Sequence, residues 1–250
     1  MIDLKSEKEI ELIAKSAEIL SEVLIKMKEM IKPGITTEEI DGLARKMVKD
    51  RGVKAAFLGY RGYPAAVCVS VNEEVVHGIP SSKIKLKEGD IVSLDFGVER
   101  EGFFSDAALT VPVGKISGRA QKLIKVTQEA LLKGIDMAKP GNRISDISAA
   151  VQRYVEANGF SVVRDLCGHG VGRKVHEEPM IPNFGKPGQG PLIQPGMVLA
   201  IEPMVNAGSY EVATLDDEWT VVTMDGAVSA HFEHTVAVTE NGPVILTRHS

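Results

Sequence analysis

Apolar side chains recur every three or four positions from Ile10 to Ile31, and the run stops at the turn-forming "KPG". This period is that of one face of an α-helix. Thr36 and Glu39 then have the spacing of a capping box, and the apolar stripe after them predicts a second helix. Most β-branched residues gather in strand-like segments, at residues 65–71, 91–98, 198–205, 220–224 and 235–238. These elements predict an α+β protein with helices packed on one face of a curved, mainly antiparallel sheet.

The helical pattern occurs twice in the chain. "KPGITTEEIDGLARKMVKDRG" from Lys32 aligns without a gap with "KPGNRISDISAAVQRYVEANG" from Lys139, an offset of 107 residues (139 minus 32). The two copies place acids at equivalent points, pairing Asp95 with Glu202 and Asp106 with Glu233. We infer a pseudo-two-fold duplicated unit, roughly residues 6–113 and 118–245, whose halves face each other across a shared site. The whole chain, residues 1–250, is then expected to be a single catalytic domain.

Two aspartates interrupt the apolar stretch "VSLDFGVEREGFFSDAALTV". A hairpin centred on Glu99 to Gly102 would place Asp106 directly opposite Asp95, on the same face of the sheet. Two carboxylates about 4 Å apart at an effective dielectric near 20 repel by roughly 4 kcal/mol. This register therefore requires a cation between them.

A metal site is predicted from four acids and one histidine, namely Asp95, Asp106, His169, Glu202 and Glu233. Any one of these residues alone would be unremarkable, since single strand-edge acids are usually solvated. Their equivalent placement in both halves favours a shared site. Oxygen ligands with one imidazole suit Mn, Fe(II), Co or Zn better than calcium or a closed tetrahedral zinc site. Four carboxylates neutralise two divalent ions, and a water between two metals is activated for hydrolysis.

Two further histidines, His77 and His176, each follow a cysteine by nine residues in segments that precede the acidic strands. A neutral imidazole in such a place can donate a hydrogen bond to developing negative charge or position a peptide bond. Without other information, an ordinary loop histidine is an equally good interpretation. His231 and His234 are expected to be structural.

Composition and charge exclude several classes of protein. The chain has 44% hydrophobic residues, 25% charged residues and a net charge of -5, which describes a soluble globular protein without a direct nucleic-acid site. The N-terminal segment mixes charges with apolar residues, so neither a signal peptide nor a membrane span is expected, and a cytoplasmic location follows. Cys68 and Cys167 are too few for a disulfide framework and are expected to be buried thiols.

Five segments of the chain resemble type I methionine aminopeptidases, the short bacterial form of the pita-bread metallopeptidase family: "SLDFG", "FFSDAALTV", "CGHGVGRKVHEEP", "LAIEPMV" and "HFEHTVAV". They occur in the family's order and spacing, and the resemblance covers nearly the whole chain. It implies the pita-bread fold, a monomer, and two divalent ions held by the five residues named above. It also implies that Glu202 is the general base and that His77 and His176 are catalytic residues that contact the substrate.

The same resemblance implies the substrate. Members of the family remove the initiator methionine from nascent proteins when the second residue is small, so transient ribosome association is expected. Residues that match the family's methionine pocket are Tyr60, Tyr63, Cys68 and Trp219. An apolar, partly aromatic slot with a thiol suits a thioether side chain. Phe57 and Val175 depart from the residues of some relatives and leave the exact shape of the pocket open.

The sequence is also compatible with two other functions. One is a proline-directed exopeptidase of the same fold, although the chain is too short for the additional N-terminal domain of aminopeptidase P and prolidase. The other is a non-catalytic module that binds a peptide terminus. Such a module would be expected to lack one or more metal ligands, and all five are present here.

Overall fold

The computed structural model describes residues 2–248. Its helices are α1 (Glu7–Met30), α2 (Thr37–Asp50), α3 (Gly118–Met137) and α4 (Ile144–Ala157), with a short 3₁₀ turn η1 (Tyr60–Gly62). Its strands are β1 (Lys54–Ala55), β2 (Cys68–Val71), β3 (Glu74–Val76), β4 (Ile91–Arg100), β5 (Phe103–Pro112), β6 (Ser161–Val162), β7 (Cys167–Gly170), β8 (Glu177–Pro182), β9 (Val198–Ile201), β10 (Met204–Asn206), β11 (Val212–Thr214), β12 (Val221–Thr223), β13 (Ser229–His231), β14 (Glu233–Thr239) and β15 (Gly242–Ile245). None of the helices in this part of the chain combines the length and apolar character needed to cross a bilayer.

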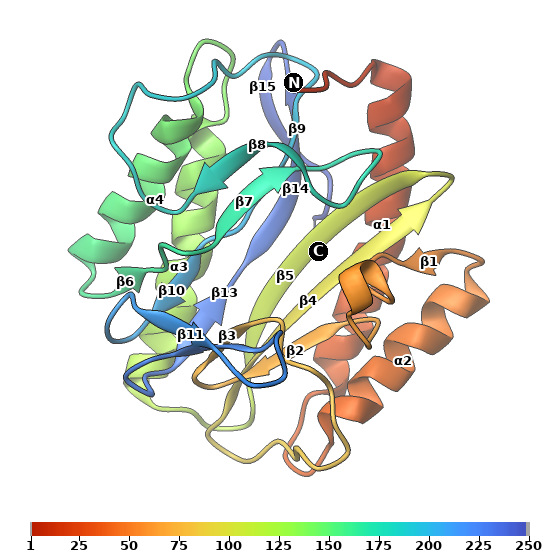
Figure 1. Cartoon of the computed structure of the whole chain (residues 1–250), viewed down its shortest axis with the longest axis vertical. Helices are drawn as coiled ribbons and strands as arrows, with labels where there is room; N and C mark the ends of the chain where they lie inside the picture. The colour runs from red at the N-terminus through yellow and green to blue at the C-terminus, as the bar shows by residue number, and fades with distance from the viewer. Residues whose placement is uncertain (1, 249–250) are drawn as a thin grey trace.

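The main sheet has the strand order β1-β4-β5-β14-β9-β7-β8, with β2 added beside β4 and β15 beside β14, and its strands pair antiparallel. The remaining strands form two three-stranded sheets, with the orders β13-β10-β6 and β11-β12-β3. Figure 1 shows α1 and α2 beside one half of the molecule, α3 and α4 beside the other, and the strands of the sheet crossing between them. The predicted mixture of helices and antiparallel sheet is confirmed.

The helix starts follow from local sequence. Thr36 accepts a hydrogen bond from the Glu39 amide at 3.3 Å, and the Glu39 carboxylate accepts from the Thr36 amide at 2.8 Å, so the predicted capping box of α2 is present. An equivalent box between Ser6 and Glu9 begins α1. The apolar stripe of α1 is buried against β4 and β5, where Leu20 packs in the same core as strand residues of the sheet. Burial of this stripe positions the two strands that carry the first acids.

The offset of 107 residues recurs in the structure. It relates both ends of α2 to both ends of α4 (37 to 144 and 50 to 157) and the last residue of α1 to that of α3 (30 to 137). It also relates two isolated backbone bridges, Thr36 to Lys85 and Arg143 to Leu192. The glycine of each "KPG" turn has nearly the same left-handed φ, 93° at Gly34 and 92° at Gly141. Equivalent turns therefore end the first helix of each half.

The predicted register of the β4–β5 hairpin is wrong by two positions. Asp106 pairs with Gly97, and Asp95 pairs with Ala108. The turn consists of Glu101 and Gly102, so its centre lies one residue later in the chain than expected. Both residues have positive φ, 54° and 80°, as a tight two-residue hairpin turn requires. A change of two positions keeps every side chain on its face. The two aspartates are therefore diagonal neighbours on one face instead of a directly opposed pair.

The predicted strand 198–205 is broken. β9 ends at Ile201, β10 begins at Met204, and the two strands belong to different sheets. Glu202 and Pro203 form the break, where proline cannot donate a hydrogen bond to a neighbouring strand. The break leaves Glu202 at the end of a central strand, facing the interior of the curved sheet.

Candidate active site

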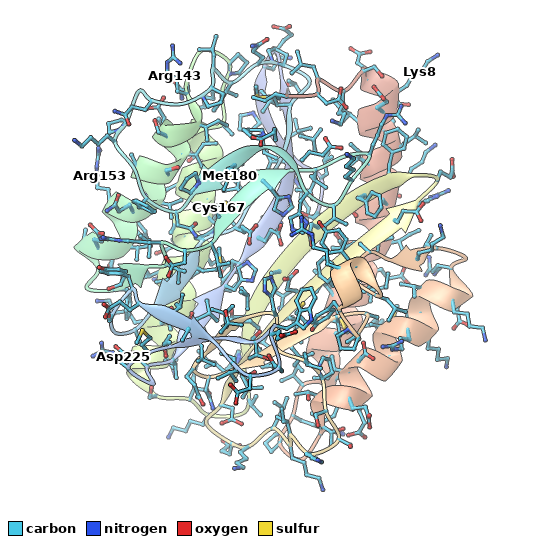
Figure 2. The ribbon with its side chains drawn as sticks, viewed as in Figure 1. Lys8, Arg143, Arg153, Cys167, Met180 and Asp225 are labelled. Atoms are coloured by element: carbon cyan, nitrogen blue, oxygen red, sulfur yellow. The ribbon has the colours of Figure 1, made fainter. Side chains whose placement is uncertain are left out.

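One cavity of about 790 Å³ is lined by all eleven residues that the sequence nominates as site residues. They are Tyr60, Tyr63, Cys68, His77, Asp95, Asp106, His169, His176, Glu202, Trp219 and Glu233. The four acids and His169 lie on or directly after β4, β5, β14, β9 and β7, which are successive neighbours in the main sheet. Figure 2 shows Cys167 and Met180, two further lining residues, on the β7–β8 side of the molecule.

The core of the cavity is a compact group of acidic and histidine side chains that could hold a metal ion. Donor atoms of Asp106, His169 and Glu233 all lie within 4.8 Å of one another. His169 Nε2 is 3.4 Å from Glu202 Oε1 and 4.0 Å from Asp106 Oδ2. The other ring nitrogen, Nδ1, lies 2.9 Å from the Gly170 carbonyl, which assigns the proton to Nδ1 and leaves the Nε2 lone pair directed at the acids.

The acids of this group lack compensation from the protein. Among residues 2–248, buried oxygens of Asp95, Asp106 and Glu233 have no hydrogen-bond partner. Burial raises the pKa of Asp95 and the pKa of Glu202 to about 7. Burial and the neighbouring acids raise the pKa of Asp106 and the pKa of Glu233 well above the ordinary range. Unpartnered carboxylate oxygens beside an imidazole nitrogen fit divalent cations, which supply the missing positive charge.

Two threonines hold the backbone of the site in place. Thr235 Oγ1 donates to the Asp106 carbonyl at 2.7 Å and accepts from the Asp106 amide at 2.9 Å. Thr110 Oγ1 makes the same pair of hydrogen bonds to the carbonyl and amide of His231, at 2.8 and 2.9 Å. These side chains replace ladder bonds where β5 separates from β14 and β13. Sequence reasoning did not identify them, because the contact joins residues more than a hundred positions apart.

His231 belongs to the site, contrary to the expectation that it is only structural. Its ring is buried, and Nε2 lies 3.4 Å from Glu202 Oε2, without the geometry of a hydrogen bond. Only Phe232 separates the end of β13 at His231 from the start of β14 at Glu233, and the alignment with β5 continues across this break, so His231 and Glu233 lie on the same face. His234 points elsewhere, with Nδ1 3.0 Å from Thr247 Oγ1, as expected.

His77 and His176 stand at the entrance to the acid group. The ring of His176 lies 4.2 Å from that of His169, and its Nδ1 is 2.9 Å from the Tyr60 hydroxyl. His77 has a left-handed backbone, with φ of 61°, which is unusual for a side chain of this size. Burial and His231 lower the pKa of His77 to about 4, and burial followed by His169 lowers the pKa of His176. Both imidazoles are therefore neutral at pH 7 and retain one N–H donor each.

An aromatic slot forms another wall of the cavity. Tyr63 and Trp219 meet edge to face with ring centroids 5.0 Å apart, and the Tyr63 hydroxyl donates to the Gly78 carbonyl at 2.9 Å. Cys68 is buried beside them, which raises the pKa of its thiol and keeps it neutral.

Further apolar residues complete the slot. Phe57 lines it, and Val175 packs behind it in the same apolar cluster. Leu166 and Met204 add apolar lining that the sequence did not single out.

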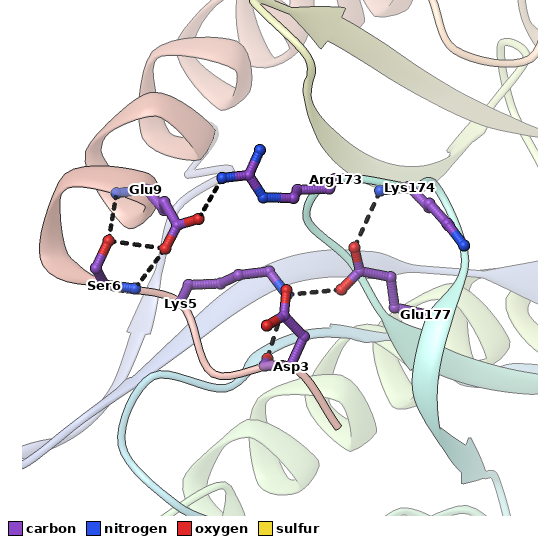
Figure 3. A network of polar contacts seen from close by, with 7 residues as sticks. All are labelled: Asp3, Lys5, Ser6, Glu9, Arg173, Lys174 and Glu177. Carbon is purple, nitrogen blue, oxygen red and sulfur yellow. Dashed lines mark hydrogen bonds and ion pairs between the residues drawn. The ribbon is translucent and has the colours of Figure 1, made fainter. Parts of the chain in front are cut away.

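The loop that carries His176 is held by the N-terminal segment (Figure 3). The buried Lys5 ammonium lies 2.8 Å from Asp3 Oδ2 and 2.7 Å from Glu177 Oε2. Glu177 Oε1 accepts a hydrogen bond from the Lys174 amide at 3.0 Å. A Cβ at Gly172 would lie 2.2 Å from Lys5 Cε, so a larger residue at this position would force the Lys5 side chain to shift. This network was not predicted, since none of its members has a recognisable spacing.

Residues 11–240 match metallopeptidase family M24. The chain belongs to this family. A methionine aminopeptidase of Clostridium perfringens is 58% identical over 247 residues, covering 99% of each chain. Methionine aminopeptidase 1 of Bacillus subtilis is 53% identical over 248 residues, covering 99% of this chain and all of that one. The family, the predicted resemblance and the buried acid–histidine group agree in indicating metal binding.

Solved structures agree with the M24 assignment. A methionine aminopeptidase of Thermotoga maritima superposes with a TM-score of 0.98 at 49% identity, covering 99% of this chain and 100% of that one. The prolidase of Pyrococcus furiosus has a TM-score of 0.81 at 23% identity and is covered over 66% of its length. The second likeness shows the shared pita-bread fold alone, which is the fold predicted from the sequence.

Proposed function

We propose that the protein is a metal-dependent methionyl aminopeptidase that removes the initiator methionine from nascent proteins and peptides with a small second residue. The observation that carries this proposal is the joint placement of the acid–histidine group and the aromatic slot in one cavity. Full-length relatives named methionine aminopeptidase, at 58% and 53% identity, support the substrate class. We further propose that residues 1–250 act as one catalytic unit, a cytoplasmic monomer with transient ribosome association.

The proposed metal ligands are Asp95, Asp106, His169, Glu202 and Glu233. Four carboxylates match the charge of two divalent ions, and Mn, Fe(II), Co and Zn all suit this donor set. When bound, such ions supply Lewis acidity and lower the pKa of a water molecule. Unpartnered carboxylate oxygens and the oriented His169 ring are the features that support this assignment.

Glu202 is the proposed general base. Its two oxygens each lie 3.4 Å from an imidazole nitrogen, of His169 on one side and His231 on the other, which restricts the orientation of the carboxylate. In this position it takes a proton from the attacking water and returns it to the departing amine. The proton moves over a short path because the base and the cleaved bond share one small, partly desolvated cavity.

His77 and His176 are the proposed hydrogen-bond donors to the cleaved peptide group. Their pKa values are lowered by burial, so each is a neutral imidazole and does not repel metal ions nearby. A neutral N–H directed at the carbonyl oxygen stabilises the negative charge that develops there. The slot around Tyr63, Cys68 and Trp219 holds the methionine side chain by apolar contact and by the polarizability of sulfur.

A peptide series tests the proposal. Metal-loaded protein is expected to release methionine from Met-Ala-Ser and to leave Leu-Ala-Ser intact, with activity abolished by chelation and restored by Mn or Co. Cleavage of an Xaa-Pro peptide in place of Met-Ala-Ser would favour a proline-directed exopeptidase. Binding of Met-Ala-Ser without turnover, unaffected by chelation, would favour the non-catalytic module.

A further inference from the structure

A second hollow adjoins the catalytic cavity. This groove, of about 610 Å³, lies between the segment 54–61 and the loop 173–176 and reaches the β4–β5 hairpin at Glu99 and Phe104. It shares five lining residues with the cavity, namely Tyr60, Arg61, Arg173, Lys174 and His176. The groove and the cavity therefore adjoin at these five residues.

The groove carries uncompensated positive charge. Lys54 is paired with Glu99 at 2.7 Å, and Arg173 is paired with Glu9 at 2.7 Å. Among residues 2–248, neither Arg61 nor Lys174 has a carboxylate within 4.0 Å. Arg61 and Lys174, two of the five residues that line both hollows, therefore carry positive charge without a carboxylate partner in this part of the chain.

Arg61 is held there by an unusual backbone. Its φ and ψ are 48° and 24°, in the left-handed region, and the glycines at 59 and 62 on either side also have positive φ. The guanidinium lies 5.4 Å from the centre of the Tyr60 ring, whose hydroxyl contacts His176. This left-handed turn between two glycines places Arg61 among the residues that line both the groove and the cavity.

We propose that this groove binds the substrate chain beyond its second residue and that Arg61 and Lys174 favour acidic side chains at the third to fifth positions. The inference rests on the proposed aminopeptidase function. A methionine enclosed in the aromatic slot leaves the rest of the peptide to exit through the cavity mouth. This basic groove adjoins the cavity on one side. On the β8 side the cavity is lined by the exposed residues Glu178 and Met180, and a chain that left there would be favoured by basic side chains.

Peptides of the form Met-Ala-Xaa-Gly-Ser, with Asp, Asn or Lys as Xaa, separate the two paths. We expect kcat/KM to be about three- to fivefold higher for Asp than for Asn, and lower for Lys than for Asn, as for exposed ion pairs. The preference should shrink as salt is raised, because surface charges are screened. Arg61→Gln and Lys174→Gln should each reduce the Asp-to-Lys ratio, and Arg61→Glu should reverse it.

Arg153→Gln is the matched control, because it removes one positive charge on α4, far from the groove (Figure 2). It should leave the Asp-to-Lys ratio at the wild-type value. Equal kcat/KM for the three peptides, or a ratio unchanged by both groove variants, would overturn the inference while the Asn peptide is still cleaved. A preference for Lys that Glu178→Gln abolishes would assign the chain to the β8 side and overturn it as well. Failure to cleave even the Asn peptide would instead refute the aminopeptidase function and the inference with it.

Discussion

Lys5 Nζ lies 2.7 Å from Glu177 Oε2, one residue beyond His176 in the chain. The Lys5 side chain is 1% exposed and that of Glu177 is 12% exposed, so this ion pair is largely removed from water. Glu177 also caps the turn through the Lys174 amide. The pair therefore joins the start of the chain to the loop that presents His176 to the cavity.

Lys5→Met should lower the free energy of unfolding by about 3 kcal/mol, because removing one partner leaves a buried charge unpaired. It should also raise KM for a Met-Ala peptide at temperatures where the variant is folded, since the His176 loop loses its anchor. Urea denaturation and steady-state kinetics measure the two effects.

Asp3→Asn provides the control for that variant. It removes an exposed contact of the same ammonium group and should change the free energy of unfolding by less than about 1 kcal/mol. Equal effects of Lys5→Met and Asp3→Asn would show that the buried pair has no special role.

Glu202→Gln keeps the size of the side chain but removes its charge and its basicity. Turnover of Met-Ala-Ser is expected to fall by about 10³-fold or more, since a base and a ligand are lost together. Metal content measured by elemental analysis distinguishes loss of the ion from loss of the base. Turnover close to the wild-type value would contradict the role assigned to Glu202.

His77→Ala should reduce kcat by about 10²- to 10³-fold while metal content stays at the wild-type value, because His77 is proposed to donate a hydrogen bond and not to hold an ion. His176→Ala tests the corresponding group on the other side. Loss of metal from either variant would mean that the imidazole is a ligand.

Protein stripped of metal by a chelator should become less stable as pH rises from about 5 to 8. Burial raises the pKa of Asp95 and of Glu202 to about 7 in the folded chain, so the folded state binds more protons than the unfolded state in this range. The stabilisation from these protonated acids is present below their unfolded pKa and is lost as pH passes about 7.

Adding Mn or Co should reverse this trend and raise Tm, because a ligand bound only to the folded state at 100 times its Kd contributes about 2.7 kcal/mol. Thermal melts across pH, with and without metal, measure both effects. Asp95→Asn should flatten the pH dependence of the metal-free protein. Constant stability from pH 5 to 8 without metal would contradict the proposed clustering of these acids.

Local patterns in the sequence were enough to predict the helices, most of the strands and the chemistry of the site. Capping residues such as Thr36 and Glu39 act within one turn, and apolar periodicity reports burial directly, so the predicted helices match the structure. The repeat with an offset of 107 residues and the acids within apolar strands could be recognised because both are patterns along the chain. These patterns predicted the four acids and His169, and the resemblance to a known family added the two histidines and the four pocket residues, so that all eleven predicted residues line the cavity.

Features that depend on contacts between distant segments could not be predicted from these patterns. The sequence alone leaves the position of the hairpin turn uncertain by one residue. The structure places the turn at Glu101 and Gly102, and this position sets the register of β4 and β5. The approach of His231 to Glu202 follows the strand break after Ile201, and the burial of Lys5 against Glu177 joins positions 172 residues apart. Such contacts arise only when the sheet curves and its layers pack, because their energy belongs to pairs of residues that no local pattern connects.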